Sequence, residues 1–183
     1  NSYRAMNIAF VVEWSRFAEE SNVNLYEVVE AIRMRPTHRN LMLPGIGVGG
    51  YCLTKDPLLA SWSRQTVFNS EPLNQSEMGV KINDKMPLYA YRFMKKELEA
   101  NFIPGKNILL LGISYRSNVG DTRYSPVEYF YNYLVKGGYA VTIHDPYVKN
   151  WEEQDIEVLN DYNSTINEKL NIVAITTAHE EYI

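Results

Sequence analysis

The sequence predicts an α/β protein in which a helical first half precedes a domain built on a parallel sheet. Apolar residues recur at helical spacing through roughly the first hundred residues. After Pro104-Gly105, short apolar runs alternate with one helical stretch, an order typical of a parallel sheet covered by helices. We therefore expect a helical domain over residues 1–103 and a sheet domain over residues 104–183.

The first element is expected to be a helix over residues 1–20. Its apolar residues fall on two stripes, one formed by Ala5, Ile8, Ala9 and Val12 and the other by Phe10, Trp14 and Phe17. A helix that is apolar around most of its circumference is buried on several sides. This pattern predicts a central or interface helix, and hence a homodimer or a higher homo-oligomer.

Two more helices are expected before the middle of the chain. Asn24 and Glu27 have the spacing of a capping box, and the helix that they open should end near Arg35-Pro36. Residues 36–51 hold four glycines and two prolines and are expected to form a loop. Asp56-Pro57 indicates the N-cap and the first-turn proline of a helix that carries Leu58, Leu59 and Trp62. Residues 72–101 are expected to form mostly one longer helix.

The second half is expected to alternate strands and helix. Residues 106–111 form a short branched apolar run typical of a buried strand. A helix over 127–135 should stop at Gly137-Gly138. A strand over 140–143 should end at Asp145-Pro146, and a last strand should span 171–176. The series implies a parallel sheet.

Composition excludes several classes of function. The 183 residues are 45% hydrophobic and 22% charged, which is ordinary for a globular protein. A net charge of −4 without a dense basic run argues against a nucleic-acid partner. We expect no membrane span and no metal site, because long apolar runs and closely spaced His/Cys ligands are lacking. The lone cysteine fits a reducing, cytoplasmic compartment.

The densest chemical signal is PGIGVGGYCLTKDP, residues 44–57. Its glycines allow close backbone approach to a ligand, and exposed N–H groups there can hold phosphate or sugar oxygens. Cys52 lies just before the expected helix start, where the helix dipole and Lys55 favour a thiolate. Asp56 shares a helical face with it, which suits thioester hydrolysis. The bland alternative is a small buried hydrophobe, the commoner role of a single cysteine.

Four ordered segments resemble the UDP-glucose/GDP-mannose dehydrogenase family. PGIGVGGYCLTKDP is similar to the family's catalytic-cysteine motif, and NSYRAMNIAF to its central helix. KINDKMP is similar to the Asn-Asp start of its linker helix, and LLLGISYRSNVGDTRYSP followed by HDPYV to the opening of its C-terminal domain. The resemblance implies a helical central dimerisation domain followed by a Rossmann-like nucleotide-binding domain, with the chain truncated at both ends. The absent initiator Met also favours a fragment.

The resemblance implies an NAD-dependent, two-step oxidation of a UDP-sugar at C6 to a uronate. A first hydride transfer makes an aldehyde, a cysteine adds to it as a thiohemiacetal, and a second transfer gives a thioester that water hydrolyses. Cys52 matches the nucleophile, Asp56 the carboxylate that assists water, and Asn1 the amide that steadies the oxyanion. The family's expected sites for the sugar, the diphosphate and NAD map onto further positions. Substrate contacts are expected from Leu43, Gly45, Gly47, Val48, Gly49, Tyr115, Arg116 and Arg39, and NAD contacts from Lys55 and Arg123.

The sequence also departs from the family. Arg116 stands where Lys is usual, and Val12 replaces an Asn before Glu13. Arg39 follows His38 in a loop of different length. The glycine fingerprint of an NAD-binding fold is not present in these residues, and Gly112 alone does not make one. The main NAD-binding domain is therefore expected to lie outside this chain.

Other residues receive plainer interpretations. Asp145 after His144 favours an Asp-Pro turn over a ligand site, and His179 is expected to be solvated. Glu152, Glu153 and Asp155 read as a solvated acidic loop. Four tyrosines lie in or beside the helix expected over 127–135, and we assign them to packing rather than base stacking. They are Tyr124, Tyr129, Tyr131 and Tyr133.

Three function classes follow. The first is part of a nucleotide-sugar oxidoreductase, acting on UDP-glucose or a UDP-N-acetylhexosamine. The second is a non-catalytic dimerisation and nucleotide-binding module, which the chain by itself favours because NAD has no visible site. The third, an unrelated thiol acyltransferase, is disfavoured because no His stands in a recognisable base motif.

Overall fold

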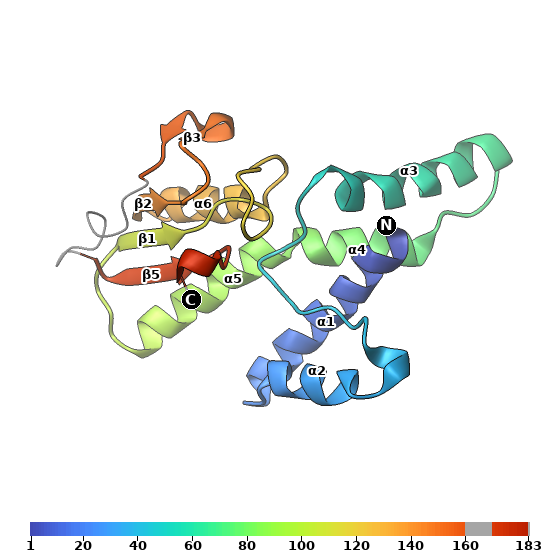
Figure 1. Ribbon diagram of the computed structural model, residues 1–183, viewed down its shortest axis with the longest axis horizontal. Coiled ribbons are helices and arrows are strands. Elements are labelled where there is room, and N and C mark those ends of the chain that lie inside the picture. The colour runs from blue at the N-terminus through green and yellow to red at the C-terminus, as the bar shows by residue number, and fades with distance from the viewer. Residues whose placement is uncertain (160–169, 183) are drawn as a thin grey trace. The chain divides into compact units, whose positions relative to one another are not determined.

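The computed structural model describes residues 1–159 and 170–182, and the chain divides into two compact units, Asn1–Met86 and Pro87–Ile183 (Figure 1). The first unit is helical. Four α-helices were expected in this part of the chain and four are present, while a short 3-10 turn occurs within the segment expected to be a loop. They are α1 (Ser2–Glu20), α2 (Leu25–Arg33), the short 3-10 turn η1 (Pro36–His38), α3 (Tyr51–Phe68) and α4 (Asn74–Asp84).

The packing of α1 on α4 forms the core of the first unit. The small residues Ala5 and Ala9 are buried on α1. A side chain at Gly79 of α4 would bring its Cβ to 3.3 Å from Met6, so glycine permits the close approach. Asn83 of α4 donates from Nδ2 to the Ala5 carbonyl at 3.0 Å. The Asn-Asp segment therefore closes α4 instead of opening a helix.

The other face of α1 stays exposed in the single chain. Phe10, Trp14 and Phe17 are 54, 49 and 58% exposed, and their ring centroids are 6.0 and 5.8 Å apart along the helix. We call these three residues the aromatic ridge. The expected burial on several sides is not met within the chain, because α4 and its neighbours cover only the small-residue face. A partner over the ridge stays a prediction.

The expected long helix over 72–101 is two helices, α4 and α5 (Met86–Ala100), separated at Lys85. Pro87 has no N–H to continue the hydrogen-bond ladder from α4, which explains the break. The structural division falls after Met86, the first residue of α5, whereas the sequence placed the domain boundary near 103. Tyr91 of α5 packs against Tyr133 and Tyr139 of the second unit, with centroids 5.9 and 6.4 Å apart.

The second unit contains a parallel sheet with strand order β2-β1-β5, as the alternating pattern predicted. The strands are β1 (Asn107–Leu111), β2 (Ala140–His144) and β5 (Ile172–Ile175). Leu111 is level with His144 on one side and Ile175 on the other. The carboxyl ends of all three strands therefore meet at one edge. The central strand β1 is buried, and Ile108, Leu109 and Leu110 have no exposed surface.

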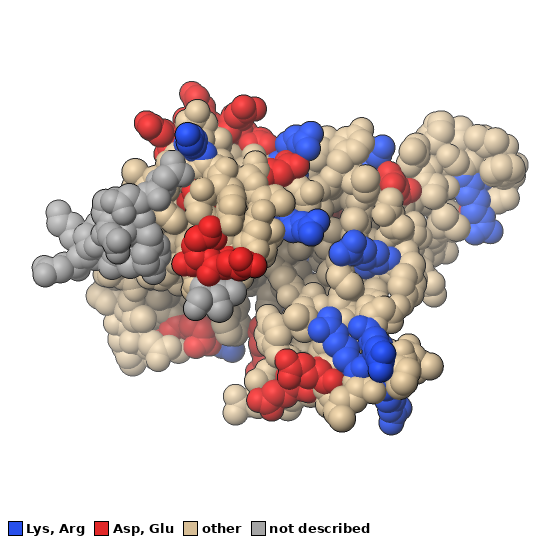
Figure 2. All heavy atoms as spheres, in the orientation of Figure 1, with Lys and Arg blue, Asp and Glu red and all other residues tan. Residues whose placement is uncertain are grey.

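Helix α6 (Pro126–Lys136) connects β1 to β2, as expected. Ser125 caps it by accepting from the Val127 N–H at 3.3 Å, and it ends at Gly137, followed by Gly138 at φ 79°. A two-stranded antiparallel pair follows, β3 (Asn150–Trp151) and β4 (Ile156–Glu157), with the 3-10 turn η2 (Glu152–Gln154) between them. Acidic side chains gather over this segment, as predicted for a solvated loop (Figure 2).

Candidate functional site

Cys52 lies in the first turn of α3, which begins six residues earlier than Asp56-Pro57 indicated. Gly50 precedes the helix at φ 78° and ψ 162°, a backbone conformation open essentially to glycine alone. The Thr54 hydroxyl donates to the Gly50 carbonyl at 2.9 Å, which reinforces this start. Pro57 is therefore inside the helix, and the Asp-Pro start was wrong. Cys52 is exposed, not a buried hydrophobe, and it lies in the first helical turn, whose N–H groups have no acceptor within the helix itself.

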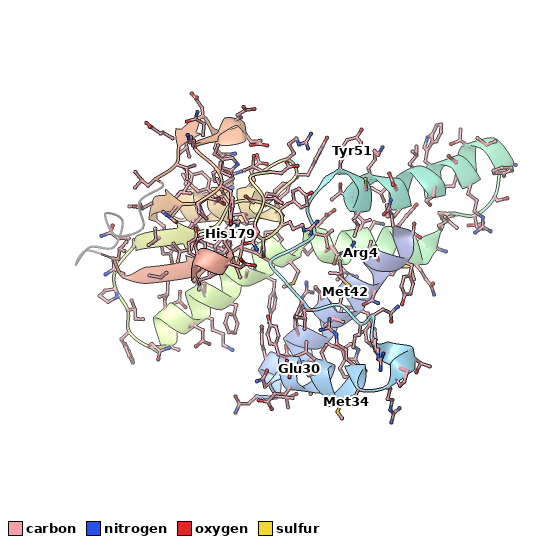
Figure 3. The ribbon with its side chains drawn as sticks, in the orientation of Figure 1. Arg4, Glu30, Met34, Met42, Tyr51 and His179 are labelled. Carbon is pink, nitrogen blue, oxygen red and sulfur yellow. The ribbon has the colours of Figure 1, made fainter. Side chains whose placement is uncertain are left out.

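Asp56 lies one helical turn after Cys52 and is joined to the start of α1. Asn1 donates from Nδ2 to Asp56 Oδ2 at 2.5 Å, across 55 residues of sequence. Lys55 Nζ lies 3.7 Å from Asp56 Oδ1 and 4.2 Å from the centroid of the Tyr51 ring, at the start of α3 (Figure 3). The fold thus brings two of the expected catalytic side chains into contact, beside the turn that carries the thiol.

The glycine loop before α3 is anchored at its beginning and open along its length. Asn7 of α1 accepts from the Met42 N–H at 2.8 Å and donates to the Asn40 carbonyl at 3.0 Å. Arg33 of α2 donates from Nε to the Leu41 carbonyl at 2.7 Å. In the part of the chain that the structure describes, backbone N–H groups of residues 43–49 donate to no protein acceptor. They are available to oxygens of a ligand.

Sequence reasoning missed Asn7 and Arg33, although both are essential to the shape of this loop. Their signal was weak, because a polar residue in a helix is usually read as part of a solvated face. Arg39, expected to contact substrate, is exposed immediately after η1, and His38, the last residue of η1, is exposed too. The structure places neither of them with Cys52 or Asp56 in any contact that it describes.

In the second unit, the loop after β1 carries the expected nucleotide-binding residues. Tyr115 is half-buried and Arg116 is exposed. The Tyr115 N–H donates to the Asp121 carbonyl at 2.9 Å, which folds the loop back on itself. Because the loop follows β1, it lies at the carboxyl edge of the parallel sheet, which is where α/β folds bind ligands.

Asp145 and His179 form a buried polar cluster at the same edge. Both are fully buried, and His179 Nε2 lies 3.2 Å from Asp145 Oδ2 (Figure 3). Asp145 also accepts from the Tyr147 N–H at 2.9 Å, which confirms the predicted Asp turn. The prediction of a solvated His179 was wrong, because residues far apart in sequence supply its partners.

Arg123 is occupied by a local ion pair. Its guanidinium donates to Asp121 at 2.7 Å, with the Arg123 side chain 78% exposed. The hydrogen bond from Arg123 holds the pKa of the Asp121 carboxyl below its usual range, and the carboxylate in turn raises the pKa of Arg123. Lys55 and Arg123, the two residues expected near NAD, therefore each have a carboxylate partner.

The tyrosines in and just before α6 divide between packing and solvent. Tyr133 packs on Tyr91, and Tyr131 packs edge-on against the buried Trp151 at 5.2 Å, as predicted. Tyr124 and Tyr129 are 55 and 59% exposed.

A hollow of about 320 Å³ lies at the opposite, amino edge of the sheet. Its lining includes Tyr91, Lys95, Lys106 and Tyr139, none of which was a predicted site residue.

The described residues offer neither a metal site nor a membrane-spanning helix. No group of three or more His, Cys, Asp or Glu side chains in the described ranges is placed to hold a metal ion. Among the helices that the structure describes, none combines the length and apolar character that crossing a membrane requires.

Two family models match the chain along most of its length. Residues 1–85 match the central domain of the UDP-glucose/GDP-mannose dehydrogenase family, and residues 109–183 match its UDP-binding domain. The chain belongs to this family. The match confirms the resemblance and agrees with the two units, a helical one and one with a parallel sheet.

Relatives in the family are nucleotide-sugar dehydrogenases. The chain is 32% identical over 182 residues to UDP-N-acetyl-D-mannosamine dehydrogenase of Methanocaldococcus jannaschii, covering 100% of this chain and 39% of that protein. Among solved structures, UDP-D-ManNAc dehydrogenase of Pyrococcus horikoshii superposes with a TM-score of 0.82 at 32% identity, covering 99% of this chain and 40% of that one.

A second solved structure agrees. NDP-N-acetyl-D-galactosaminuronic acid dehydrogenase of Methanosarcina mazei superposes with a TM-score of 0.88 at 25% identity, covering 100% of this chain and 40% of that one. The chain thus spans about two fifths of the length of the relatives that it matches.

The described residues do not fit NAD in the way a dinucleotide-binding fold holds it. That fold needs a glycine-rich turn leading from a strand directly into a helix N-terminus. Here Gly112 follows β1 at φ 84°, but an added Cβ would lie 2.3 Å from the Thr177 carbonyl oxygen, so protein fills that space. Helix α6 begins only at Pro126.

Proposed function

We propose that this chain is the catalytic-cysteine and nucleotide-binding part of an NAD-dependent nucleotide-sugar dehydrogenase that oxidises C6 of a UDP-sugar to a uronate. The observation that carries the proposal is the contact between Asn1 and Asp56, one turn from the exposed Cys52. A structural surface cysteine has no need of a carboxylate one turn along its helix that is held by an amide from the start of another helix. A nucleophile that forms and then hydrolyses a thioester does.

Cys52 would act on the aldehyde level of the substrate. Its thiolate sulfur adds to the C6 carbon, a C–S bond forms, and the carbonyl π electrons move onto oxygen as an alkoxide. Asn1 has two amide N–H bonds, one of which is donated to Asp56. The other N–H can donate a hydrogen bond to the alkoxide, and this hydrogen bond becomes stronger as negative charge develops on the oxygen. The remaining N–H groups at the start of α3 add positive potential.

Asp56 would act at the hydrolytic step. Water attacks the thioester carbon, Asp56 accepts a water proton, and the C–S bond breaks to release the carboxylate and regenerate the thiol. General base catalysis of this kind contributes about 10²–10⁴-fold. Both oxidations need a hydride acceptor, which NAD supplies in dehydrogenases of this family. The described residues do not fit the dinucleotide, and the roles given to Cys52, Asn1 and Asp56 involve the substrate and water alone.

The second unit would bind the nucleotide. Arg116 is exposed, carries a fork of donors suited to a diphosphate, and lies beside Tyr115 on a loop at the carboxyl edge of the sheet. The match of residues 109–183 to a UDP-binding domain supports uracil as the base. The relatives' names favour an N-acetylhexosamine as the sugar over glucose. We also keep the expectations of a homo-oligomer, and of a reducing, cytoplasmic compartment that preserves the free thiol.

The second candidate is a non-catalytic nucleotide-binding and dimerisation module. It is favoured by one observation, the lack of a dinucleotide fingerprint around β1. Both candidates predict that the chain by itself binds a UDP-sugar weakly and oxidises nothing. They differ for the whole protein, where only the first predicts uronate formation.

The test combines calorimetry with an NADH absorbance assay. The 183-residue chain should bind UDP-N-acetylmannosamine or UDP-glucose, and Arg116→Ala should weaken binding by about tenfold or more, because a charge-assisted hydrogen bond is lost. Arg92→Ala, an exposed cation on α5, is the matched control and should bind like the parent. NADH production by the chain alone would show that the cofactor site has been misplaced.

A further inference from the structure

We propose that His179 is a positioning residue for nucleotide binding, because it holds the Asn118 N–H and so sets the loop that presents Tyr115 and Arg116. This inference rests on the proposed nucleotide site in the second unit. We define the substrate loop as residues 113–124, between β1 and the cap of α6. His179 does not touch the substrate in this proposal, and its effect passes through the backbone of the loop.

The hydrogen bonds of His179 determine which of its nitrogens carries the proton. Its Nδ1 lies 2.9 Å from the Asn118 backbone nitrogen, and an N–H can only donate. Nδ1 must therefore be the acceptor, so the proton of the neutral ring sits on Nε2 and is donated to Asp145 at 3.2 Å. The fully buried imidazole is thus oriented by a carboxylate on one side and holds a loop N–H on the other.

Asn118 is held a second time through its side chain. Its Oδ1 accepts from the Glu180 N–H at 3.0 Å, immediately after His179 in the chain. The residue adopts φ 59°, in the left-handed region where Asn is enriched. Residues 179 and 180 therefore clamp both the backbone and the side chain of Asn118.

The beginning of the substrate loop has an anchor of its own. Asp145 Oδ2 accepts from the Ile113 N–H at 2.8 Å and from the Ser114 N–H at 3.3 Å. The Thr177 hydroxyl donates to the Ser114 carbonyl at 2.6 Å. All of these groups are buried, so the bonds are made away from solvent.

Tyr115 and Arg116 lie between the two anchors, after residue 114 and before residue 118. With both anchors intact, the backbone of residues 115–117 spans a fixed gap, and the exposed Arg116 starts from a defined Cα position. Without the Asn118 anchor, the loop gains freedom that a ligand must then remove, at a cost in affinity. Asp145 joins both anchors, because it accepts from the loop start and from His179.

Two substitutions separate the hydrogen bonds of His179. An Asn side chain places its Oδ1 near the position of Nδ1, so His179→Asn keeps the acceptor for Asn118 and loses the bond to Asp145. A Gln side chain places its Nε2 near the position of the ring Nε2, so His179→Gln keeps the bond to Asp145 and releases Asn118. Each variant loses one buried hydrogen bond, so both should lower Tm to a similar extent.

The test measures UDP binding to the 183-residue chain by calorimetry, with Tm as the stability readout. We expect His179→Gln to lose about tenfold in affinity for UDP, which corresponds to the loss of one hydrogen bond. We expect the affinity of His179→Asn for UDP to stay within about threefold of the parent. Equal losses in both variants would reduce His179 to a merely structural role and overturn the proposal, as would no loss in either. Failure of the parent chain to bind UDP would overturn the nucleotide site itself.

Two measurements on the parent chain need no variant and so stand even if both variants unfold. Nitrogen-15 NMR of His179 should show the Nε2–H tautomer, and hydrogen exchange should show a protected Asn118 amide. The opposite tautomer, or an amide that exchanges like an open loop, would overturn the clamp whatever the result for UDP. The two failures are therefore distinguishable.

Discussion

The start of α3 and the carboxyl edge of the sheet use polar side chains in opposite ways. At α3, Cys52 and Asn1 are exposed and Asp56 is only half-buried. At the sheet edge, Ser114, Asp145 and His179 are fully buried and hydrogen-bonded to one another or to the loop backbone. Groups that react must meet substrate and water, whereas groups that fix a loop are more effective where water cannot compete.

This difference predicts different consequences of substitution. Changes at the start of α3 should remove activity and leave the free energy of unfolding almost unchanged, because few buried contacts are lost. Changes in the buried cluster should affect stability and nucleotide affinity together.

The largest effect is expected for Cys52→Ser in the whole protein. Uronate formation should fall by about 10⁴-fold or more, because the covalent intermediate cannot form. Aldehyde-level chemistry should remain, since the first hydride transfer needs no sulfur. Uronate is measured by chromatography and Tm by calorimetry, and Tm should be unchanged. Thr66→Ser, farther along α3, is the control; normal turnover by the Cys52 variant would rule out covalent catalysis.

Asp56→Asn should slow the hydrolytic step by about 10²–10⁴-fold and leave the earlier steps intact. A thioester on Cys52 should then accumulate, and intact-protein mass spectrometry would detect the added mass. Glu71→Gln removes one acidic charge from an exposed position and serves as the control. A slow Asp56 variant that accumulates no adduct would contradict the assigned role.

The aromatic ridge of α1 sharpens the contrast, because it is exposed in the single chain without being polar. We expect a homodimer formed largely over Phe10, Trp14 and Phe17. Trp14→Glu should weaken dimerisation at least about tenfold, since a large aromatic residue at an interface centre carries much of the binding energy. Tyr129→Glu, an equally exposed aromatic on α6, should leave it unchanged.

Sedimentation velocity at micromolar concentration measures both dimer variants. A clean monomer of the parent chain would contradict the predicted dimer before any variant is made. Dissociation by the Tyr129 variant would instead place the interface on the second unit.

The smallest effect is expected at the exposed pair of Asp121 and Arg123. Arg123→Gln should return the pKa of Asp121 upward, towards the usual value of 3.8. Because the folded-state pKa is depressed, the pair stabilises above the unfolded pKa, and this contribution is lost as pH falls through the folded pKa. The two proteins should differ slightly at neutral pH and converge in strong acid. An NMR titration of Asp121 gives the pKa, and an unchanged value would disprove the coupling.

Local sequence signals predicted most of the fold. Gly137-Gly138 ended α6, and the apolar run before Gly112 became the central strand. Asn24 capped α2, accepting from the Tyr26 N–H at 3.1 Å and donating to Glu27 at 2.9 Å. The errors occurred where two local signals competed. Pro57 predicted a helix start, but the helix had already begun after Gly50, and Pro87 divided a pattern that looked continuous.

The family, the fold class, the order of the elements and the candidate nucleophile could all be predicted from residues near one another in the sequence. Each depends on residues close together in the chain, such as the glycines that precede Cys52. Only the tertiary structure decided that Asn1 meets Asp56 and that His179 holds Asn118, because 55 and 61 residues separate these partners. Whether a polar side chain is solvated or buried depends on the groups that the fold places next to it. The periodicity of the sequence does not predict those groups when they are distant along the chain.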